Sequence, residues 1–335
     1  MLRLGIIGCG KVTTMFHLKS IKDVEAVTVT AVADLDRARM EGVRRKAGAE
    51  RGYTDPKELL ADPDVEAVAI NTPPRFHEGL VLEAIEAGKH VLCEKPLAQT
   101  IEGCRRIGDA QRGAELVVLP VHNYAFTPCL MTAQELIEKG EIGALQGIDI
   151  RFDNNLWSYG PKTDFRTKET YGIVEDILPH ALSVVQALSD PVSEAKEAEG
   201  WRKKYPVLDN FRLAMATGSG VTVRGEMNWT SLIPGFTVKA KGEEGAIHID
   251  LMKAPYGVTV KTDRGRKQIG GMGFGQYLDL IRLKHPAFVG QYEHLVATVG
   301  GTEEPRFTVE DEIRMMGVLE EVVKILSEDE KREQT

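Results

Sequence analysis

Residues 1–121 alternate short apolar runs with amphipathic segments of helical period, and this alternation restricts the possible folds more than any other feature. The expected strands and helices follow one another at 2–7, 12–21, 27–33, 36–47, 65–70, 76–87, 91–93, 101–111 and 116–121. Strands joined by helices run in the same direction, so they form a parallel sheet with helices on both faces. The pattern therefore predicts a doubly wound α/β domain.

The rest of the chain has a different rhythm, with consecutive strands separated by turn residues. Helices are expected at 130–139, in part of 173–188, and at 277–283, 288–299 and 309–326. Strands are expected at 148–152, 211–216, 221–227, 236–240, 246–249 and 258–260. Strands without helices between them form an antiparallel or mixed sheet. We therefore expect two domains, 1–121 and 122–335.

Charge and cysteine usage argue against several classes of protein. The 335 residues carry a net charge of −8 without a long basic run, so nucleic acid and anionic membranes are not expected partners. No apolar stretch is long enough to span a bilayer. Paired spacing is absent among the cysteines, which are Cys9, Cys93, Cys104 and Cys129. Free thiols, a cytoplasmic location and no metal site are the expected consequences.

A glycine-rich turn follows the first expected strand. Gly8 and Gly10, followed by Lys11 and Val12, fit a Gly-x-Gly pattern between a strand and a helix. The first glycine permits a tight turn, and the second lets the backbone approach a pyrophosphate at the helix N-terminus. The third position is Thr13 instead of Gly or Ala. The pattern is incomplete, so a purely structural turn stays an alternative.

An acidic residue, Asp34, ends the strand expected at 27–33. An acid at this place in a dinucleotide-binding domain binds the ribose 2′-hydroxyl of NAD. Its charge would repel the 2′-phosphate of NADP, so NAD is favoured and NADP remains possible. Arg37 and Arg39 could pair with such a phosphate, but a solvated helix face is the preferred interpretation of both.

Polar residues also follow the later strands of the first domain. Asn71, Thr72 and Pro73 come directly after one strand, and His77 stands at the next helix start, where a hydrogen-bonded structural role is favoured. Lys95 stands at the tip of the following strand. Ligands of open α/β sheets bind beyond the carboxyl ends of the strands, so Lys95 is predicted to meet a ligand.

Residues 88–91 (Gly-Lys-His-Val) lead to 94–96 (Glu-Lys-Pro), and Thr72, Pro73 and His77 precede them. This set resembles the Gfo/Idh/MocA oxidoreductases, named for glucose-fructose oxidoreductase and inositol dehydrogenase. The resemblance implies a Rossmann domain followed by an α/β domain with a large open, mostly antiparallel sheet. It also implies a cis Lys-Pro bond. The residues predicted to hold the cofactor are Gly8, Gly10, Lys11, Val12, Asp34, Asn71, Thr72, Pro73, His77, Glu94 and Lys95.

Residues 171–180 resemble a family segment that contains an Asp-x-x-x-His pattern, and Asp176 and His180 match its two polar site positions. Residues four apart share one face of a helix. Pro179 stands where the family has a small residue. Because proline is tolerated in the first helical turn, the helix is expected to begin within 175–178. Asp176 as a helix cap stays an alternative.

Further substrate-pocket candidates lie around the second domain. Asn123 and Tyr124 match the family segment that leaves the last strand of the Rossmann domain, and a linker role is the alternative. Trp157, Arg166 and Tyr277 are weaker candidates, for which ordinary packing or a surface ion pair is an equal interpretation.

The resemblance implies an NAD-dependent dehydrogenase or reductase that acts on a secondary alcohol of a sugar, sugar derivative or cyclitol. Its expected catalytic residues are Lys95, His180 and Asp176. His180 would be the general acid/base, Lys95 would bind the hydroxyl or take its proton, and Asp176 would orient one of them. A hydrolase using transient oxidation and a non-catalytic NAD-binding sensor are the alternatives. A homodimer or homotetramer is expected.

Overall fold

A computed structural model describes residues 1–156 and 171–333, and the chain divides into two compact units. The first unit comprises Met1–Asn123 with Leu278–Ile313, and the second comprises Tyr124–Tyr277 with Arg314–Thr335. The division expected at residue 121 assigns 278–313 to the second domain, whereas in the structure this segment packs with the first unit.

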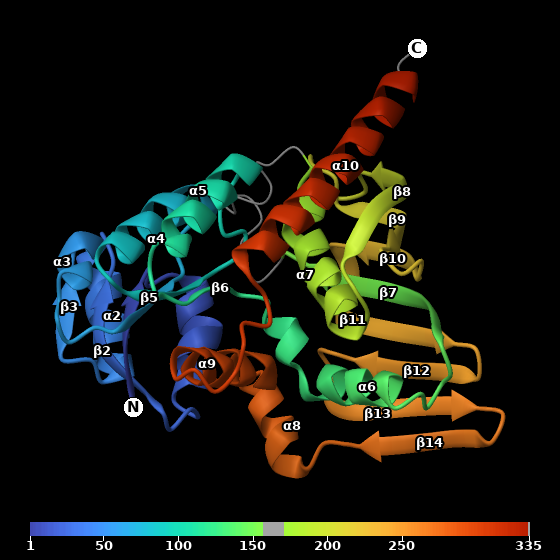
Figure 1. The fold of residues 1–335 in the computed structure, drawn as a ribbon, viewed down its shortest axis with the longest axis horizontal. Coiled ribbons are helices and arrows are strands. Elements are labelled where there is room, and N and C mark those ends of the chain that lie inside the picture. The colour runs from blue at the N-terminus through green and yellow to red at the C-terminus, as the bar shows by residue number, and fades with distance from the viewer. Residues whose placement is uncertain (157–170, 334–335) are drawn as a thin grey trace. The chain divides into compact units, whose positions relative to one another are not determined.

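The first unit is built on a six-stranded parallel sheet in the order β3-β2-β1-β4-β5-β6. This is the strand order of a dinucleotide-binding Rossmann domain, whose direction of winding reverses between β1 and β4. Its elements are β1 (Leu2–Ile7), η1 (Thr13–His17), α1 (Leu18–Ile21), β2 (Val27–Ala33), α2 (Arg37–Ala47), β3 (Arg51–Tyr53), α3 (Pro56–Leu60), β4 (Ala67–Ile70), η2 (Pro74–Phe76), α4 (His77–Glu86), β5 (His90–Cys93), α5 (Ile101–Arg112) and β6 (Val118–Pro120). Helices α4 and α5 of this unit are drawn in blue-green to green in Figure 1. The predicted doubly wound parallel sheet is confirmed.

Local signals account for most of these elements. All four residues of β4 are buried, as expected for a strand covered on both faces. Helix α2 begins after Asp36, whose side chain accepts hydrogen bonds from two backbone N–H groups of the first turn. The helix predicted at 12–21 begins as a π-helix and continues as α1. Strand β3 was not predicted, because it is a three-residue strand at the edge of the sheet.

The chain returns to the first unit through α9 (Pro286–Val299). Phe288, Tyr292 and Leu295 from this helix join the core cluster that also contains Leu4 and Leu92 from the sheet. Burial of these apolar side chains is the physical reason why the segment belongs with the Rossmann sheet and not with the neighbouring residues of the chain.

The second unit contains an eight-stranded sheet in the order β14-β13-β12-β11-β7-β10-β9-β8. Among the strands of the described residues in this sheet, β7 and β10 alone pair in parallel, so the expected mostly antiparallel sheet is confirmed. The strands are β7 (Leu145–Asn155), β8 (Val192–Trp201), β9 (Asn210–Thr217), β10 (Thr222–Asn228), β11 (Thr230–Gly242), β12 (Gly245–Asp250), β13 (Ala254–Thr262) and β14 (Gly265–Gly270). The remaining elements of the chain are η3 (Asn123–Phe126), α6 (Pro128–Glu138), α7 (Ile173–Leu188), α8 (Phe274–Ile281) and α10 (Val309–Glu333).

Strands β8 and β14 were not predicted, because they lack an alternating apolar pattern. They are the two edges of the sheet, and most of their residues are exposed or half-buried. Polar and charged side chains on edge strands hinder pairing with other chains, so the sequence there does not carry the ordinary strand signal.

The prediction that helix α7 begins within 175–178, which was based on Pro179, is wrong. The helix begins at Ile173, after Gly172 (φ 42°), so Pro179 lies at its seventh position. The N–H of Ile173 donates to the carbonyl of Leu208, which anchors the first turn to the segment just before β9. We attribute the start of the helix to this tertiary contact. Pro179 lies in the helix interior, where a proline has no N–H for the helical hydrogen bond. Asp176 therefore lies within the helix and is not its cap.

In residues 1–156 and 171–333, no helix combines the length and the apolar character needed to cross a membrane.

Candidate active site

The glycine turn after β1 has the geometry that a glycine requires. Gly8 has φ +97°, and a Cβ atom there would lie 2.8 Å from the backbone carbon and oxygen of Asn71. The turn is therefore packed directly against the end of β4. A Cβ at Gly10 would meet no atom within 4 Å, so this side of the turn is open. A ligand can approach the backbone there, as a pyrophosphate does in this class of turn.

Thr13 fills the third position of the glycine pattern with a structural hydrogen bond. Its Oγ1 donates to the carbonyl of Gly8 (2.6 Å) and accepts from the side-chain amide of Asn71 (3.2 Å). These bonds join the turn after β1 to the loop after β4. The departure from Gly or Ala is therefore compatible with the turn, because the threonine side chain points inward and not toward the open side.

Asp34 is held at the carboxyl end of β2 by three donors. Its carboxylate accepts from the backbone N–H of Cys9 (2.8 Å) and of Asp36 (2.8 Å) and from the guanidinium of Arg39 (2.9 Å). Burial would raise the pKa of Asp34, but these hydrogen bonds outweigh burial and lower it. The carboxylate is thus ionised at neutral pH. Burial of the Cys9 thiol, together with the negative charge of Asp34, raises the pKa of Cys9 to about 12.

Arg39 is exposed, as expected for a solvated helix face, and it also forms an ion pair with Asp34. Its side chain is 57% exposed but reaches back to Asp34. Arg37 is exposed, as expected for a residue on the outer face of α2. Residue spacing alone did not show that Arg39, and not Arg37, would contact Asp34, because this contact depends on the direction in which α2 begins after its N-cap, Asp36.

Lys95 follows β5 directly, and the bond between Lys95 and Pro96 is cis, as the family resemblance implied. Its neighbour Glu94 accepts a hydrogen bond from Nε2 of His17 (2.9 Å), whose Nδ1 lies 2.7 Å from the hydroxyl of Tyr292. The sequence analysis missed His17 and Tyr292. The two residues are 275 positions apart, and no local pattern connects them.

His77 is buried, and both its ring nitrogens face backbone carbonyl oxygens. The oxygens belong to Thr72 and Pro96, each at 2.7 Å. The predicted hydrogen-bonded structural role is consistent with this geometry, which joins the loops after β4 and β5.

The second unit brings Tyr124 and His180 together. Their rings lie 5.1 Å apart with an interplanar angle of 88°, and the Tyr124 ring also contacts Phe236 (4.9 Å). Asp176 and His180 lie four residues apart on α7, and both are half-buried. An aromatic ring, an imidazole and a carboxylate thus come from η3 and α7 in one unit.

The remaining predicted site residues differ in how far they are buried. Lys11 and Pro73 are exposed, Val12 and Thr72 are half-buried, and Asn123 is buried. Tyr277 is exposed at the end of the segment assigned to the second unit. Trp157 and Arg166 lie outside the described residues. In the part of the chain that the structure describes, no group of three or more His, Cys, Asp or Glu side chains is placed to hold a metal ion.

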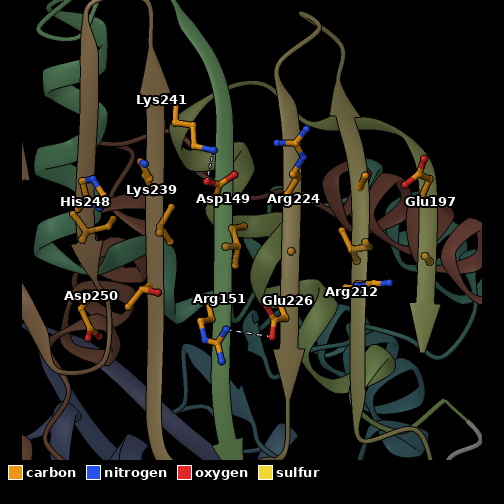
Figure 2. A pocket seen from close by; sticks show the side chains of 18 of the residues that line it. Asp149, Arg151, Glu197, Arg212, Arg224, Glu226, Lys239, Lys241, His248 and Asp250 are labelled. Atoms are coloured by element: carbon orange, nitrogen blue, oxygen red, sulfur yellow. Dashed lines mark ion pairs between the residues drawn. The ribbon is translucent and has the colours of Figure 1, made fainter. Parts of the chain in front are cut away.

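A groove of about 1350 Å³ runs across the open face of the second sheet. Figure 2 shows its charged side chains rising from the strands, with the ion pairs Asp149–Lys241 and Arg151–Glu226. Among the described residues, none of the predicted site residues lines this groove. The groove is therefore a feature separate from the catalytic and cofactor candidates.

The Rossmann strand order, the glycine turn and the ionised Asp34 are the features of a dinucleotide-binding domain. Two family profiles match, namely the oxidoreductase family with an NAD-binding Rossmann fold over residues 2–122 and the GFO/IDH/MocA C-terminal domain over residues 130–248. The chain belongs to the Gfo/Idh/MocA family.

Several known proteins are similar to this chain. Inositol 2-dehydrogenase 1 of Saccharopolyspora erythraea is 30% identical over 278 residues, which are 74% of this chain and 80% of that protein. Myo-inositol 2-dehydrogenase of Thermotoga maritima is 32% identical over 142 residues, 42% of each chain. Matches to several curated relatives span 42–58% of their length.

An oxidoreductase from Agrobacterium radiobacter, solved with NAD⁺, L-tartaric acid and magnesium, shares the fold. Its TM-score is 0.86 at 19% identity, over 97% of this chain and 96% of that one. At this identity the comparison supports the fold alone.

Proposed function

We propose that this protein is an NAD-dependent oxidoreductase that moves a hydride between the nicotinamide and a secondary alcohol or ketone of a sugar, a sugar derivative or a cyclitol. The observation that carries the proposal is the position of Lys95 at the carboxyl end of β5, on the same sheet edge as the Gly8 turn and Asp34. Ligands of open α/β sheets bind at that edge. The names of the inositol dehydrogenases among the relatives support a polyol substrate.

The residues of the first unit fit NAD. The open side of Gly10 leaves room for a pyrophosphate, and the ionised carboxylate of Asp34 can accept a ribose hydroxyl. The other residues proposed to contact the cofactor are Lys11, Val12, Asn71, Thr72, Pro73, His77 and Glu94. When bound, the nicotinamide supplies the hydride acceptor, and the protein orients the reactants and handles the proton.

The proton of the reacting hydroxyl needs an acceptor from the protein. We assign that role to His180, because an imidazole titrates near neutral pH. Lys95 donates a hydrogen bond to the same hydroxyl oxygen and stabilises the negative charge that develops there. Asp176 orients His180 or the substrate from the same face of α7. Asn123 and Tyr124, with Trp157 and Arg166, remain proposed substrate contacts.

We expect kcat/KM to be at least about tenfold higher with NAD than with NADP, because an ionised Asp34 repels the 2′-phosphate. Asp34→Ala should reduce this ratio, whereas Arg39→Ala should increase it by removing the positive charge that offsets Asp34. Steady-state kinetics with both cofactors measure the ratio, and Arg37→Ala is the matched control on the same helix. A wild-type preference for NADP would contradict the role given to Asp34.

The proposed activity predicts substrate-dependent NADH formation with a panel of monosaccharides, sugar derivatives and cyclitols, followed by absorbance with NAD and with NADP. The same assay, run with glycosides, separates a dehydrogenase from a hydrolase. Release of the aglycone without accumulation of NADH would favour the hydrolase, and tight NAD binding without any turnover across the panel would favour a sensor.

We further propose that the protein is cytoplasmic and forms a homodimer or homotetramer through the open sheet of the second unit. All four cysteines are free thiols, which supports a reducing compartment. The mixed charges across the groove of Figure 2 support a self-complementary polar contact. Sedimentation velocity at low and high salt measures the mass, and a monomer in both conditions contradicts the oligomer.

A further inference from the structure

A chain of three side chains in the first unit ends on the backbone of Lys95. The hydroxyl of Tyr292 lies 2.7 Å from Nδ1 of His17, and Nε2 of His17 lies 2.9 Å from one carboxylate oxygen of Glu94. The other oxygen of Glu94 accepts from the backbone N–H of Lys95 (3.3 Å). Tyr292, which belongs to α9, is thus linked through two side chains to the residue proposed to meet the substrate.

These contacts do not depend on the charge of the His17 ring. Burial would raise the pKa of Glu94, but the hydrogen bond from His17 and the charge of Lys95 outweigh burial and lower it, so the carboxylate is an acceptor. Both the cation and one neutral tautomer of His17 have the N–H at Nε2 that this acceptor needs. Burial, followed by the charge of Glu94, raises the pKa of Tyr292 and keeps its hydroxyl protonated. That hydroxyl donates to an unprotonated Nδ1 and accepts from a protonated one.

Packing holds the His17 ring in this orientation. Its side chain is 1% exposed. Its ring meets the ring of Phe288 at 5.0 Å and that of Tyr292 at 5.8 Å, at interplanar angles of 67° and 83°. Both aromatic partners come from α9 and belong to the buried core cluster of the first unit. A hydrogen-bonded polar network inside a packed core is rigid, so the position of α9 is transmitted to Glu94.

The segment that carries Lys95 is anchored separately on its other side. The N–H of Leu97 donates to a carboxylate oxygen of Glu312 (3.2 Å), and the Leu97 side chain is buried. Lys95 therefore stands between two held residues, Glu94 before it and Leu97 after it. Loss of the Tyr292 hydroxyl would weaken the first anchor and leave the second in place.

We propose that Tyr292 is a positioning residue for Lys95 and acts through His17 and Glu94. Its hydroxyl fixes the imidazole, the imidazole fixes the carboxylate, and the carboxylate holds the backbone from which the lysine side chain extends. The catalytic consequence rests on the proposed function, whereas the structural link rests on the contacts alone. Helix α9 thereby contributes to the active site as well as to the apolar core.

Amide hydrogen exchange of the full chain, followed by nuclear magnetic resonance, measures the link without any turnover. In Tyr292→Phe the ring still fills its place in the core, so the change is confined to the hydroxyl. Exchange at the N–H of Lys95 should accelerate by about tenfold or more, the scale of one lost buried hydrogen bond. The N–H of Leu97 is the internal control and should stay within about threefold of wild type. Unchanged exchange at Lys95, or equal acceleration at both sites, overturns the link.

Kinetics of the same variant measure the consequence with a substrate found in the sugar and cyclitol panel. NAD is held at saturation for each variant, because Glu94 and Lys95 are proposed cofactor contacts and the affinity for NAD is expected to change as well. We expect kcat to fall by about 10- to 100-fold. In a Lys95→Ala background, Tyr292→Phe should change kcat by less than about twofold, since the residue through which it acts is gone. An unchanged kcat in the first background, or the same loss in both, overturns the positioning role.

Tyr53→Phe is the matched control, because it removes a comparable hydrogen bond in the same unit. The hydroxyl of Tyr53 donates to Asp62 (3.0 Å), whose side chain is 2% exposed. This variant should keep kcat within about twofold and leave exchange at Lys95 unchanged; a loss of kcat equal to that of Tyr292→Phe contradicts the proposal. Faster exchange at Lys95 in a protein without turnover keeps the link and refutes the proposed function. Unchanged exchange in an active enzyme does the reverse.

Discussion

Replacing Lys95 with alanine is expected to lower kcat by about 10²- to 10⁴-fold, the range associated with loss of a positioned proton-transfer or charge-stabilising group. The substitution removes the only part of residue 95 that can meet a hydroxyl, and it leaves the Gly8 turn and Asp34 in place. NAD should therefore bind with nearly unchanged affinity. Stopped-flow absorbance at saturating NAD and calorimetric titration of the cofactor measure the two quantities.

Lys57→Ala is the matched control for Lys95→Ala. Lys57 is a lysine of the same unit whose side chain is 71% exposed and pairs at the surface with Glu83, so its loss should not change kcat. A Lys95→Ala enzyme with near-normal kcat would show that another group handles the hydroxyl. His180→Asn in the second unit would then be the decisive variant, because it removes the other proposed proton acceptor.

Replacing Glu312 with alanine is expected to lower the free energy of unfolding by about 3–5 kcal/mol, the usual cost of breaking a buried ion pair or its hydrogen bonds. The Glu312 side chain is 4% exposed and pairs with the fully buried ring of His122. Its other oxygen accepts from the backbone N–H of Leu97 (3.2 Å). The variant would leave these partners buried without their acceptor. Urea unfolding followed by circular dichroism measures the loss.

Glu310→Ala is the control for this change. Its side chain is 55% exposed and lies 4.0 Å from Arg112, so its removal should alter stability by less than about 0.5 kcal/mol. A similar loss in both variants would show that α10 is destabilised in general and that the buried pair has no special weight.

The pH dependence of the Glu312 contribution has a definite sign. Burial would raise the pKa of Glu312, but the charge and hydrogen bond of His122 outweigh it and lower the pKa. A carboxyl group with a lowered pKa in the folded state stabilises the fold above its unfolded pKa of about 4.3. The stability difference between wild type and Glu312→Ala should therefore shrink as the pH falls below about 4.3. A difference that grows in acid would contradict the ionised state of Glu312.

Predictions from the sequence were most successful for positions that depend only on the neighbouring residues of the chain. Gly8, Asp34 and Lys95 each follow a strand of the parallel sheet, and the strand pattern alone places them at one edge. The same reasoning was wrong for the start of α7, because a contact with Leu208 and not the position of Pro179 decides where that helix begins. The ion pair between the exposed Arg39 and Asp34 was not predicted, because it joins a residue of α2 to the end of β2.

The periodicity of this sequence by itself determined a doubly wound parallel sheet, a second sheet that is antiparallel or mixed, and the sheet edge that carries the glycine turn and Lys95. The tertiary structure alone decided which distant side chains meet there. Tyr292 reaches His17 only because α9 packs into the core of the first unit, and Glu312 reaches His122 across 190 positions. The two carbonyl oxygens that His77 contacts likewise belong to separate loops, those of Thr72 and Pro96. Local patterns determine which face of an element is buried, whereas the partner of a buried polar group depends on how remote segments pack.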